Sequence, residues 1–327
     1  MNIALPLPRI ENTIEANLSA EKAELLSGLL SPQAHIDPKY FYDDVGCELF
    51  TRICELDEYY PTRTEAAIFQ DCRAQISAAL PEASQWIDLG CGDCAKSVGW
   101  LEHVAPTRLV GVDIAGDFLQ SSLTGVAARF PSIDCIGVVS DFTQAMDLHS
   151  LLQERPDAPP VFFYPGSSIG NFDRPHALQF LRSIRRHCGS DGRLLIGVDL
   201  VKSRDVLEVA YDDAQGVTAA FNLHVLDVVN RQLDADFDAQ RFRHRALFDV
   251  DQQRIEMQLV AEQDQAVHFA GDAIRHFGEG EHVLTEYSHK YTVDGFAAML
   301  REAGFGRYQV WTVADEWFGV FLAEPVK

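Results

Sequence analysis

Residues 85–113 read QWIDLGCGDCAKSVGWLEHVAPTRLVGVD, and their pattern indicates the fold class. An apolar run over 85–89 ends at a Gly-x-Gly turn, and residues 95–103 then have the spacing of an amphipathic helix. A second apolar run follows over 109–113. A strand, a helix and another apolar strand in this order are typical of a parallel sheet with helices on both faces.

The same alternation continues along the chain on both sides of this stretch. A helix is predicted over 63–80, and further strands are predicted over 133–139, 161–164 and 194–198 with helices between them. Beyond residue 200 the pattern changes to a long helix over 205–233 and a set of antiparallel strands. These strands are predicted over 244–250, 254–261, 266–269 and 281–287. A helix over 293–303 and an antiparallel strand pair, 308–313 and 318–322, are expected to complete the sheet at its edge.

These patterns predict an α/β fold, a doubly wound Rossmann-like sheet with an inserted α+β lid that binds the substrate. We divide the chain into an N-terminal segment packing with the substrate domain, a core, an inserted domain and a return to the core. Their bounds are 1–60, 61–200, 201–287 and 288–327.

Polar groups at three predicted strand ends indicate a nucleoside site. The turn contains Gly90 and Gly92, and glycines there let a ligand approach the backbone. Asp113 follows about 20 residues later and can accept both ribose hydroxyls. Asp141 and Phe142 follow the third strand, where they suit an adenine amine and ring face. A dinucleotide turn would need a third glycine at Ala95, so S-adenosylmethionine (SAM) fits better than a nicotinamide cofactor. The alternative is that the two aspartates only cap helices.

Charge and cysteine usage exclude several classes of partner. The formal charge is −22, with 49 Asp and Glu against 27 Lys and Arg, so neither nucleic acid nor an anionic membrane is expected as a partner. Seven scattered cysteines are typical of reduced thiols in the cytoplasm. Cys91 and Cys94 form a Cys-x-x-Cys pair without two further ligands at suitable spacing, so no metal is expected. We expect a monomer.

Several further motifs stand in order along the chain and carry a family resemblance. They are FYD at 41–43, EYYPTR at 58–63, GSSIGN at 166–171, YDD at 211–213, GVTA at 216–219, RIEM at 254–257 and LTEYS at 284–288. Together they resemble the histidine Nα-methyltransferases of ergothioneine biosynthesis, from about residue 36 to the C-terminus. The resemblance implies SAM as the cofactor and L-histidine as the substrate, with up to three methyl transfers to the α-amine.

The resemblance also implies a role for individual residues. Those that would hold SAM are Tyr42, Gly90, Lys96, Asp113, Asp141 and Phe142. Asn171 and Tyr211 would grip the substrate carboxylate, and Gly166 would lie near the α-amine. The residues that would address the imidazole are Tyr59, Glu286 and Ser288, with Met257 beside them. The predicted catalytic residues are Tyr42, Tyr59 and Asn171, although the residues do not identify the proton acceptor.

Three other functions are compatible with parts of this pattern. A SAM-dependent N-methyltransferase acting on a different free amino acid or amine would keep the cofactor pocket and change the side-chain contacts. A non-catalytic adenosyl-binding module would bind the cofactor without turnover. A nicotinamide oxidoreductase is disfavoured by Ala95 at the third glycine position.

Overall fold

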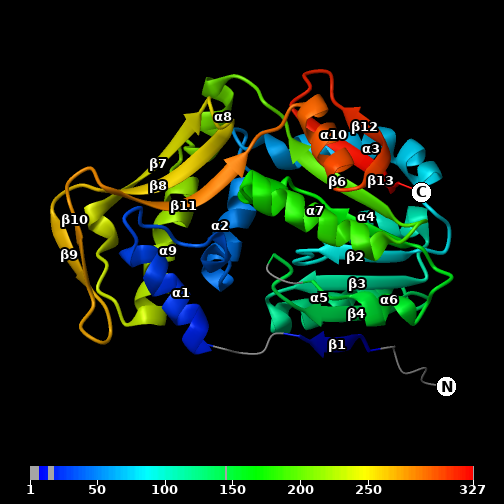
Figure 1. The fold of residues 1–327 in the computed structure, drawn as a ribbon, viewed down its shortest axis with the longest axis horizontal. Helices are drawn as coiled ribbons and strands as arrows, with labels where there is room; N and C mark the ends of the chain where they lie inside the picture. The colour runs from blue at the N-terminus through cyan, green and yellow to red at the C-terminus, as the bar shows by residue number, and fades with distance from the viewer. Residues whose placement is uncertain (1–6, 14–17, 144–145, 327) are drawn as a thin grey trace.

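The computed structural model describes residues 7–13, 18–143 and 146–326; residues 1–6 and 14–17 of the predicted N-terminal segment and residue 327 lie outside the described residues. Figure 1 shows two lobes. The sheet lobe contains β1–β6, α3–α7, α10, β12 and β13, and the second lobe contains α1, α2, α8, α9 and β7–β11. None of the described helices is both long and apolar enough to cross a lipid bilayer.

Eight strands of the described chain form the large sheet, in the order β1-β4-β3-β2-β5-β6-β13-β12. Their bounds are Arg9–Asn12 (β1), Gln85–Leu89 (β2), Arg108–Asp113 (β3), Asp134–Val139 (β4), Pro160–Tyr164 (β5), Arg193–Asp199 (β6), Phe305–Thr312 (β12) and Phe318–Pro325 (β13). Strands β1 to β6 pair in parallel, whereas β13 is antiparallel to both β6 and β12. The predicted doubly wound sheet and antiparallel edge pair are therefore confirmed. The order reverses between β2 and β5, which leaves a crevice at the carboxyl ends of the strands.

Helices cover both faces of this sheet because its strands are apolar on both sides. Trp86 and Ile87 are adjacent in β2, and both are fully buried in different hydrophobic cores. One core contains residues of α3 (Tyr60–Ala79), α4 (Ala95–Val104) and α5 (Gly116–Arg129). The other contains residues of α6 (His149–Gln153), α7 (Arg174–Cys188) and α10 (Val293–Glu302). Burial on both faces is typical of a parallel sheet and agrees with the predicted architecture.

The second lobe has a third core, to which two distant parts of the chain contribute. Its elements are α1 (Leu18–Leu30), η1 (Pro38–Phe41), α2 (Asp44–Cys54), α8 (Arg204–Tyr211), α9 (Val217–Leu233), η3 (Ala239–Arg241), β7 (Phe242–Asp249), β8 (Arg254–Ala261), β9 (Gln265–His268), β10 (Ile274–Phe277) and β11 (His282–His289). Leu29 and Phe41 from the N-terminal part are buried with Val225 and Leu259 in that core. Strands β11, β8 and β7 form an antiparallel sheet, and β9 and β10 form a separate pair.

The predicted single helix over 205–233 is wrong, because the structure has two helices there, α8 and α9. The break follows from local chemistry between them. Asp213 is buried and its carboxylate accepts hydrogen bonds from the amides of Val217 (3.0 Å) and Thr218 (2.7 Å), which starts α9. Gly216 has φ +71°, a left-handed conformation that ends any continuous helix. The break places Tyr211 at the last turn of α8.

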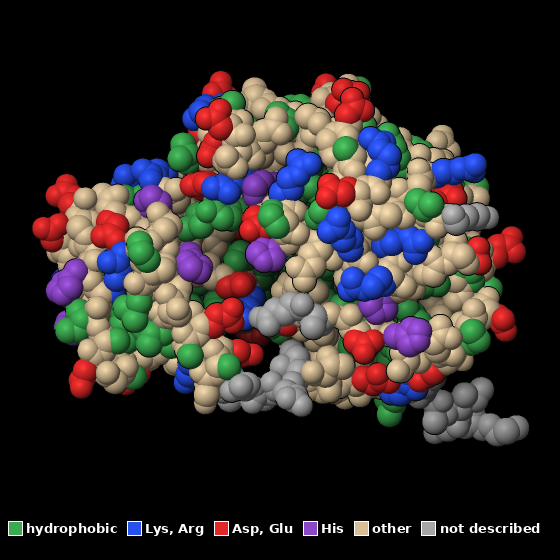
Figure 2. All heavy atoms as spheres, viewed as in Figure 1, with side chains coloured by type: hydrophobic (Ala, Val, Ile, Leu, Met, Phe, Trp, Pro, Cys, Tyr) green, Lys and Arg blue, Asp and Glu red, His purple; other side chains and the backbone are tan. Residues whose placement is uncertain are grey.

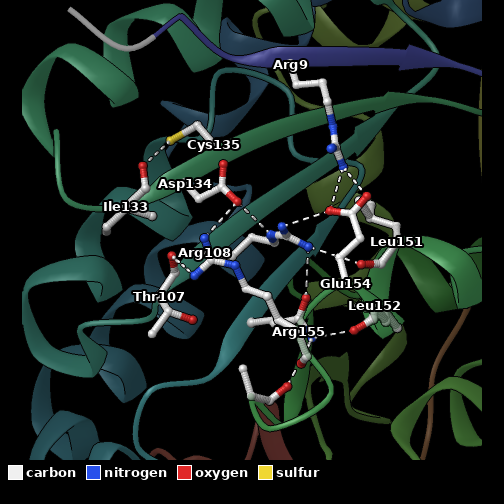
Figure 3. A network of polar contacts seen from close by, with 12 residues as sticks. Arg9, Thr107, Arg108, Ile133, Asp134, Cys135, Leu151, Leu152, Glu154 and Arg155 are labelled. Carbon is white, nitrogen blue, oxygen red and sulfur yellow. Dashed lines mark hydrogen bonds and ion pairs between the residues drawn. The ribbon is translucent and has the colours of Figure 1, made fainter.

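Strand β1 was not predicted, and the structure places it at the edge of the large sheet beside β4. Figure 3 shows the polar network below it. Glu154 accepts hydrogen bonds from Arg9 (2.9 and 3.0 Å) and from the buried guanidinium of Arg108 (2.9 Å), which also donates to Asp134 (2.9 Å). The N-terminal part of the chain therefore contributes a strand to the sheet lobe as well as helices to the second lobe.

Candidate functional site

All eight side chains or backbone positions predicted to touch the substrate or act in catalysis line one cavity between the lobes. They are Tyr42, Tyr59, Gly166, Asn171, Tyr211, Met257, Glu286 and Ser288. The sheet lobe supplies the loop after β5, and the second lobe supplies α8, β8 and β11. Figure 2 shows the molecule hollowed between the lobes. Folding thus brings together residues from six separate stretches of the sequence.

The glycine turn after β2 presents open space toward the strand ends. Gly90 and Gly92 have φ of +69° and +52°. A Cβ built on Gly92 would meet nothing within 4 Å, and one on Gly90 would meet only the Phe142 ring, at 3.5 Å. Asp113 accepts hydrogen bonds from the amides of Gly92 (2.9 Å) and Ala115 (3.0 Å), so it holds the turn and the start of α5 together. This open, glycine-lined cradle fits the nucleoside of SAM.

Of the other predicted cofactor residues, Phe142 contacts this cradle, and Lys96, Asp141 and Tyr42 have the contacts that follow. Phe142 packs edge-on against Tyr164, with ring centroids 6.0 Å apart. Asp141 accepts a hydrogen bond from the amide of Thr143 at 3.1 Å, which turns the chain at the end of β4. Lys96 is in the first turn of α4, and its ammonium pairs with Glu65 at 2.7 Å. Tyr42 stands where the second lobe meets the cavity, with its ring 6.1 Å from that of Phe221.

One end of the cavity offers neutral hydrogen-bond donors. Asn171 is the last residue of η2 (Ser168–Asn171), and its side chain forms no hydrogen bond with any described residue. Tyr211 and Ser288 are buried, and their hydroxyl oxygens lie 2.7 Å apart. Burial raises the pKa of Tyr211, so it is a neutral phenol near pH 7. This end can bind a carboxylate through uncharged donors.

A buried lysine that the sequence did not reveal stands behind these hydroxyls. The Lys290 ammonium donates to Tyr211 (2.8 Å), Ser288 (2.8 Å) and Asp199 (2.8 Å). Asp199 also binds Lys202 (2.6 Å) and Tyr60 (2.7 Å). Since Lys290 occupies an acceptor site on each hydroxyl and one hydroxyl proton is shared between them, one proton is left for a ligand. Nothing in the local sequence predicts this, because residues 60, 199, 202 and 290 meet only in the folded chain.

Glu286 supplies a hydrogen-bond acceptor to the cavity, and it lies on β11 two residues before Ser288. Glu286 is directly opposite Met257 of β8, at a register shift of the pair. Its carboxyl group has no hydrogen bond or ion pair with any described residue. Burial raises its pKa from 4.5 to about 7, and the charge of Lys290 only partly opposes that shift. An unpartnered, partly buried carboxyl group in a cavity is suited to bind a ligand that donates a hydrogen bond.

Glu286→Gln is expected to remove part of the pH dependence of stability. The folded protein keeps this proton up to about pH 7, whereas the unfolded chain releases it near pH 4.5. The free energy of unfolding of the wild type therefore falls as the pH rises through that window, and it stops falling above about pH 7. From pH 5 to pH 8, we expect the unfolding free energy of the wild type to fall by about 1–3 kcal/mol more than that of the variant. Denaturant titrations at several pH values measure this, with Glu279→Gln, an exposed carboxyl group, as the control. Parallel pH profiles for wild type and Glu286→Gln would contradict it.

Aromatic rings close the space between the two ends. The Tyr59 ring lies 6.1 Å from that of Tyr211 and 6.3 Å from that of Phe50. Burial raises the pKa of Tyr59 well above 10, so it does not supply a phenolate base near neutral pH. Within the described chain, no three His, Cys, Asp or Glu side chains are grouped so as to hold a metal ion. Cys91 and Cys94 are buried free thiols in the glycine turn.

Comparison with known proteins places this site in context. Residues 21–325 match the model of a family described as "Histidine-specific methyltransferase, SAM-dependent". The chain is 37% identical to histidine N-alpha-methyltransferase of Mycolicibacterium smegmatis, over 96% of this chain and 98% of that protein. It is 36% identical to the protein of the same name from Mycobacterium tuberculosis, over 94% of this chain and 96% of that protein. It is 26% identical to ergothioneine biosynthesis protein 1 of Neurospora crassa, over 94% of this chain but 35% of that protein.

Proposed function

The chain belongs to the family of SAM-dependent, histidine-specific methyltransferases, and we propose that it methylates the α-amine of L-histidine up to three times, giving histidine betaine. The observation that carries the proposal is the cavity with two chemically different ends. Asn171 and the Tyr211–Ser288 pair form one end, and the unpartnered Glu286 forms the other. A free amino acid with a polar, hydrogen-bonding side chain has the matching groups.

We place the cofactor and the substrate as follows. Gly90, Lys96, Asp113, Asp141, Phe142 and Tyr42 hold SAM at the ends of β2, β3 and β4. Asn171 and Tyr211 bind the carboxylate, and Gly166 lies beside the α-amine. Glu286 accepts from the imidazole N–H, with Tyr59 and Met257 completing that wall. We assign Ser288 to the carboxylate end instead of the imidazole, because its hydroxyl lies 2.7 Å from that of Tyr211.

The reaction requires mainly alignment, because the SAM sulfonium is already a strong electrophile. When bound, SAM would supply the methyl group to the α-nitrogen and would leave as S-adenosylhomocysteine. The α-ammonium would first release a proton to solvent, since an ammonium has no lone pair. Holding the nitrogen on the sulfur–methyl axis lowers the entropic part of the barrier. The aromatic wall, with Tyr59 and Tyr42, would attract the growing alkylammonium by about 0.5–2 kcal/mol, which favours retention for further transfers.

Incubating the purified protein with L-histidine and SAM, followed by mass spectrometry of the amino acid, tests the proposal. We expect mono-, di- and trimethylated histidine to appear in succession. A panel of other free amino acids distinguishes the alternative, an N-methyltransferase acting on a different amine. Methylation of another amino acid with none of histidine would overturn the substrate assignment, and cofactor binding without any turnover would indicate a binding module.

Glu286→Ala is expected to lower kcat/KM for histidine by about 10–100-fold, because the imidazole N–H loses its hydrogen-bond acceptor inside the cavity. An amino acid with an apolar ring should lose less, since it has no hydrogen bond there to forfeit. Steady-state kinetics with both substrates measure the difference, with Glu279→Ala as the surface control. Unchanged histidine kinetics would remove Glu286 from the substrate site.

We further propose that the chain acts in the cytoplasm as a monomer on the free amino acid. The strongly acidic balance, 49 acidic against 27 basic residues, supports the absence of nucleic-acid partners. Light scattering after size-exclusion chromatography measures the mass in solution, and a mass of twice the chain would overturn the monomer.

A further inference from the structure

A single buried carboxylate joins the cofactor side of the site to the substrate side. Glu65 on α3 is 1% exposed. Its Oε2 accepts a hydrogen bond from the Lys96 ammonium of α4 at 2.7 Å, and its Oε1 accepts one from the Gly166 amide after β5 at 2.7 Å. Lys96 is assigned above to the cofactor and Gly166 to the region of the substrate amine. Each oxygen of Glu65 therefore accepts a hydrogen bond, one from a group assigned to the cofactor and one from a group assigned to the substrate.

Two glycines make room for the Glu65 carboxylate and the Lys96 ammonium. A Cβ built on Gly197 of β6 would lie 2.1 Å from Glu65 Oε1, so a side chain there would displace the carboxylate. A Cβ on Gly166 would lie 3.1 Å from the Lys96 ammonium, so that glycine leaves room for the lysine. The absence of a side chain at Gly166 and Gly197 therefore leaves the space that Lys96 and Glu65 occupy.

The segment that Glu65 holds is strained. Gly166 and Ser167 both have positive φ, +82° and +61°, and the latter is a conformation that L side chains rarely adopt. Such a backbone persists only where neighbouring groups impose it. Glu65 fixes the Gly166 amide, and the Asp199 amide donates to the Ser167 hydroxyl at 2.8 Å. Removing the first of these two anchors should let the segment relax away from the cavity.

We propose that Glu65 is a positioning residue for methyl transfer: it fixes Lys96 and Gly166 relative to each other and so sets the alignment of the donor with the amine. The inference rests on the proposed function. It implies that cofactor and amino acid bind cooperatively, because each ligand stabilises one end of the same bridge. A residue of purely structural importance would change stability without changing this coupling.

The experiment compares Glu65→Gln and Glu65→Ala with the wild type, using Gln75→Ala on the exposed side of α3 as the control. Calorimetry gives the affinity for histidine with and without S-adenosylhomocysteine, and kinetics give kcat and KM per folded protein. We expect the wild type to bind histidine about 5–150-fold more tightly with S-adenosylhomocysteine present. In Glu65→Ala this ratio should fall close to one and kcat by about 100-fold. Glu65→Gln keeps an acceptor for the Gly166 amide but loses the charge that holds Lys96, so it should fall between the two.

The outcomes separate this inference from the proposed function. If the wild type makes no methylated histidine, the proposed function fails. If the wild type is active but shows no coupling, or if Glu65→Gln keeps both coupling and kcat, only the role of Glu65 is overturned. Should Glu65→Ala not fold, Glu65→Gln decides the question, since its amide is nearly the same size as the carboxylate. A variant whose thermal stability falls while coupling stays at the wild-type value would show a structural role and overturn the inference.

Discussion

Lys290→Met is expected to lower kcat/KM for histidine by at least about 100-fold and the free energy of unfolding by about 3 kcal/mol. The Lys290 ammonium is fully buried and orients two side chains assigned to the substrate, Tyr211 and Ser288, at 2.8 Å each. Methionine has nearly the same length but no donor. The two hydroxyls would then turn toward each other or toward Asp199, and the proton available to the ligand would be lost.

Lys202→Met is the matched control for this prediction. Lys202 donates to the same carboxylate, Asp199, at 2.6 Å, and its side chain is 5% exposed, but it bonds neither Tyr211 nor Ser288. Both variants remove one ammonium from Asp199, so both should unfold at lower denaturant concentration. Only Lys290→Met should show the large loss in kcat/KM per folded protein. Equal kinetic losses in the two variants would assign the effect to Asp199 and its stability, and would refute a direct role for Lys290.

Asn171→Asp is expected to reduce kcat/KM for histidine by about 1,000-fold while leaving the unfolding midpoint unchanged. The substitution keeps the shape of the side chain but replaces an amide donor with a carboxylate. If the substrate carboxylate binds there, a donor is lost and a like charge is added, which together cost several kcal/mol. Because the Asn171 side chain bonds no described residue, the folded protein loses no internal hydrogen bond.

Histamine provides the specific control, because it has the imidazole and the amine of histidine but no carboxylate. Its binding should be insensitive to Asn171→Asp, or tighter, since its ammonium would face a new negative charge. Calorimetric titration of both ligands into wild type and variant measures this. Equal weakening of histidine and histamine binding would show that the substrate carboxylate does not contact Asn171, and it would contradict the proposed orientation of the substrate.

The elements that could be predicted are those whose secondary structure depends on residues close in the sequence. The apolar runs of β2 and β3, the Gly90–Gly92 turn and the helix between them have their own periodicity, and the structure confirms them. The break between α8 and α9 was missed, because a hydrophobic pattern runs through residues 205–233 and the Asp213 cap is a weaker signal. Strand β1 was missed because four residues without clear alternation carry no pattern, and only the free edge of β4 makes them a strand.

Residue patterns along the chain were enough to predict the doubly wound sheet and its glycine turn, and the family motifs indicated the residues that line the cavity. The contacts that those residues make with one another depend on the folded chain. Lys290, Asp199 and Tyr60 are distant in the chain, and none of them belongs to a pattern that predicts their contact. Glu65 likewise reads as one more residue of a helix until Lys96 and Gly166 fold against it. The physical reason is that hydrogen bonds between buried charges depend on distances of a few ångströms in space, whereas periodicity reports only burial along the chain.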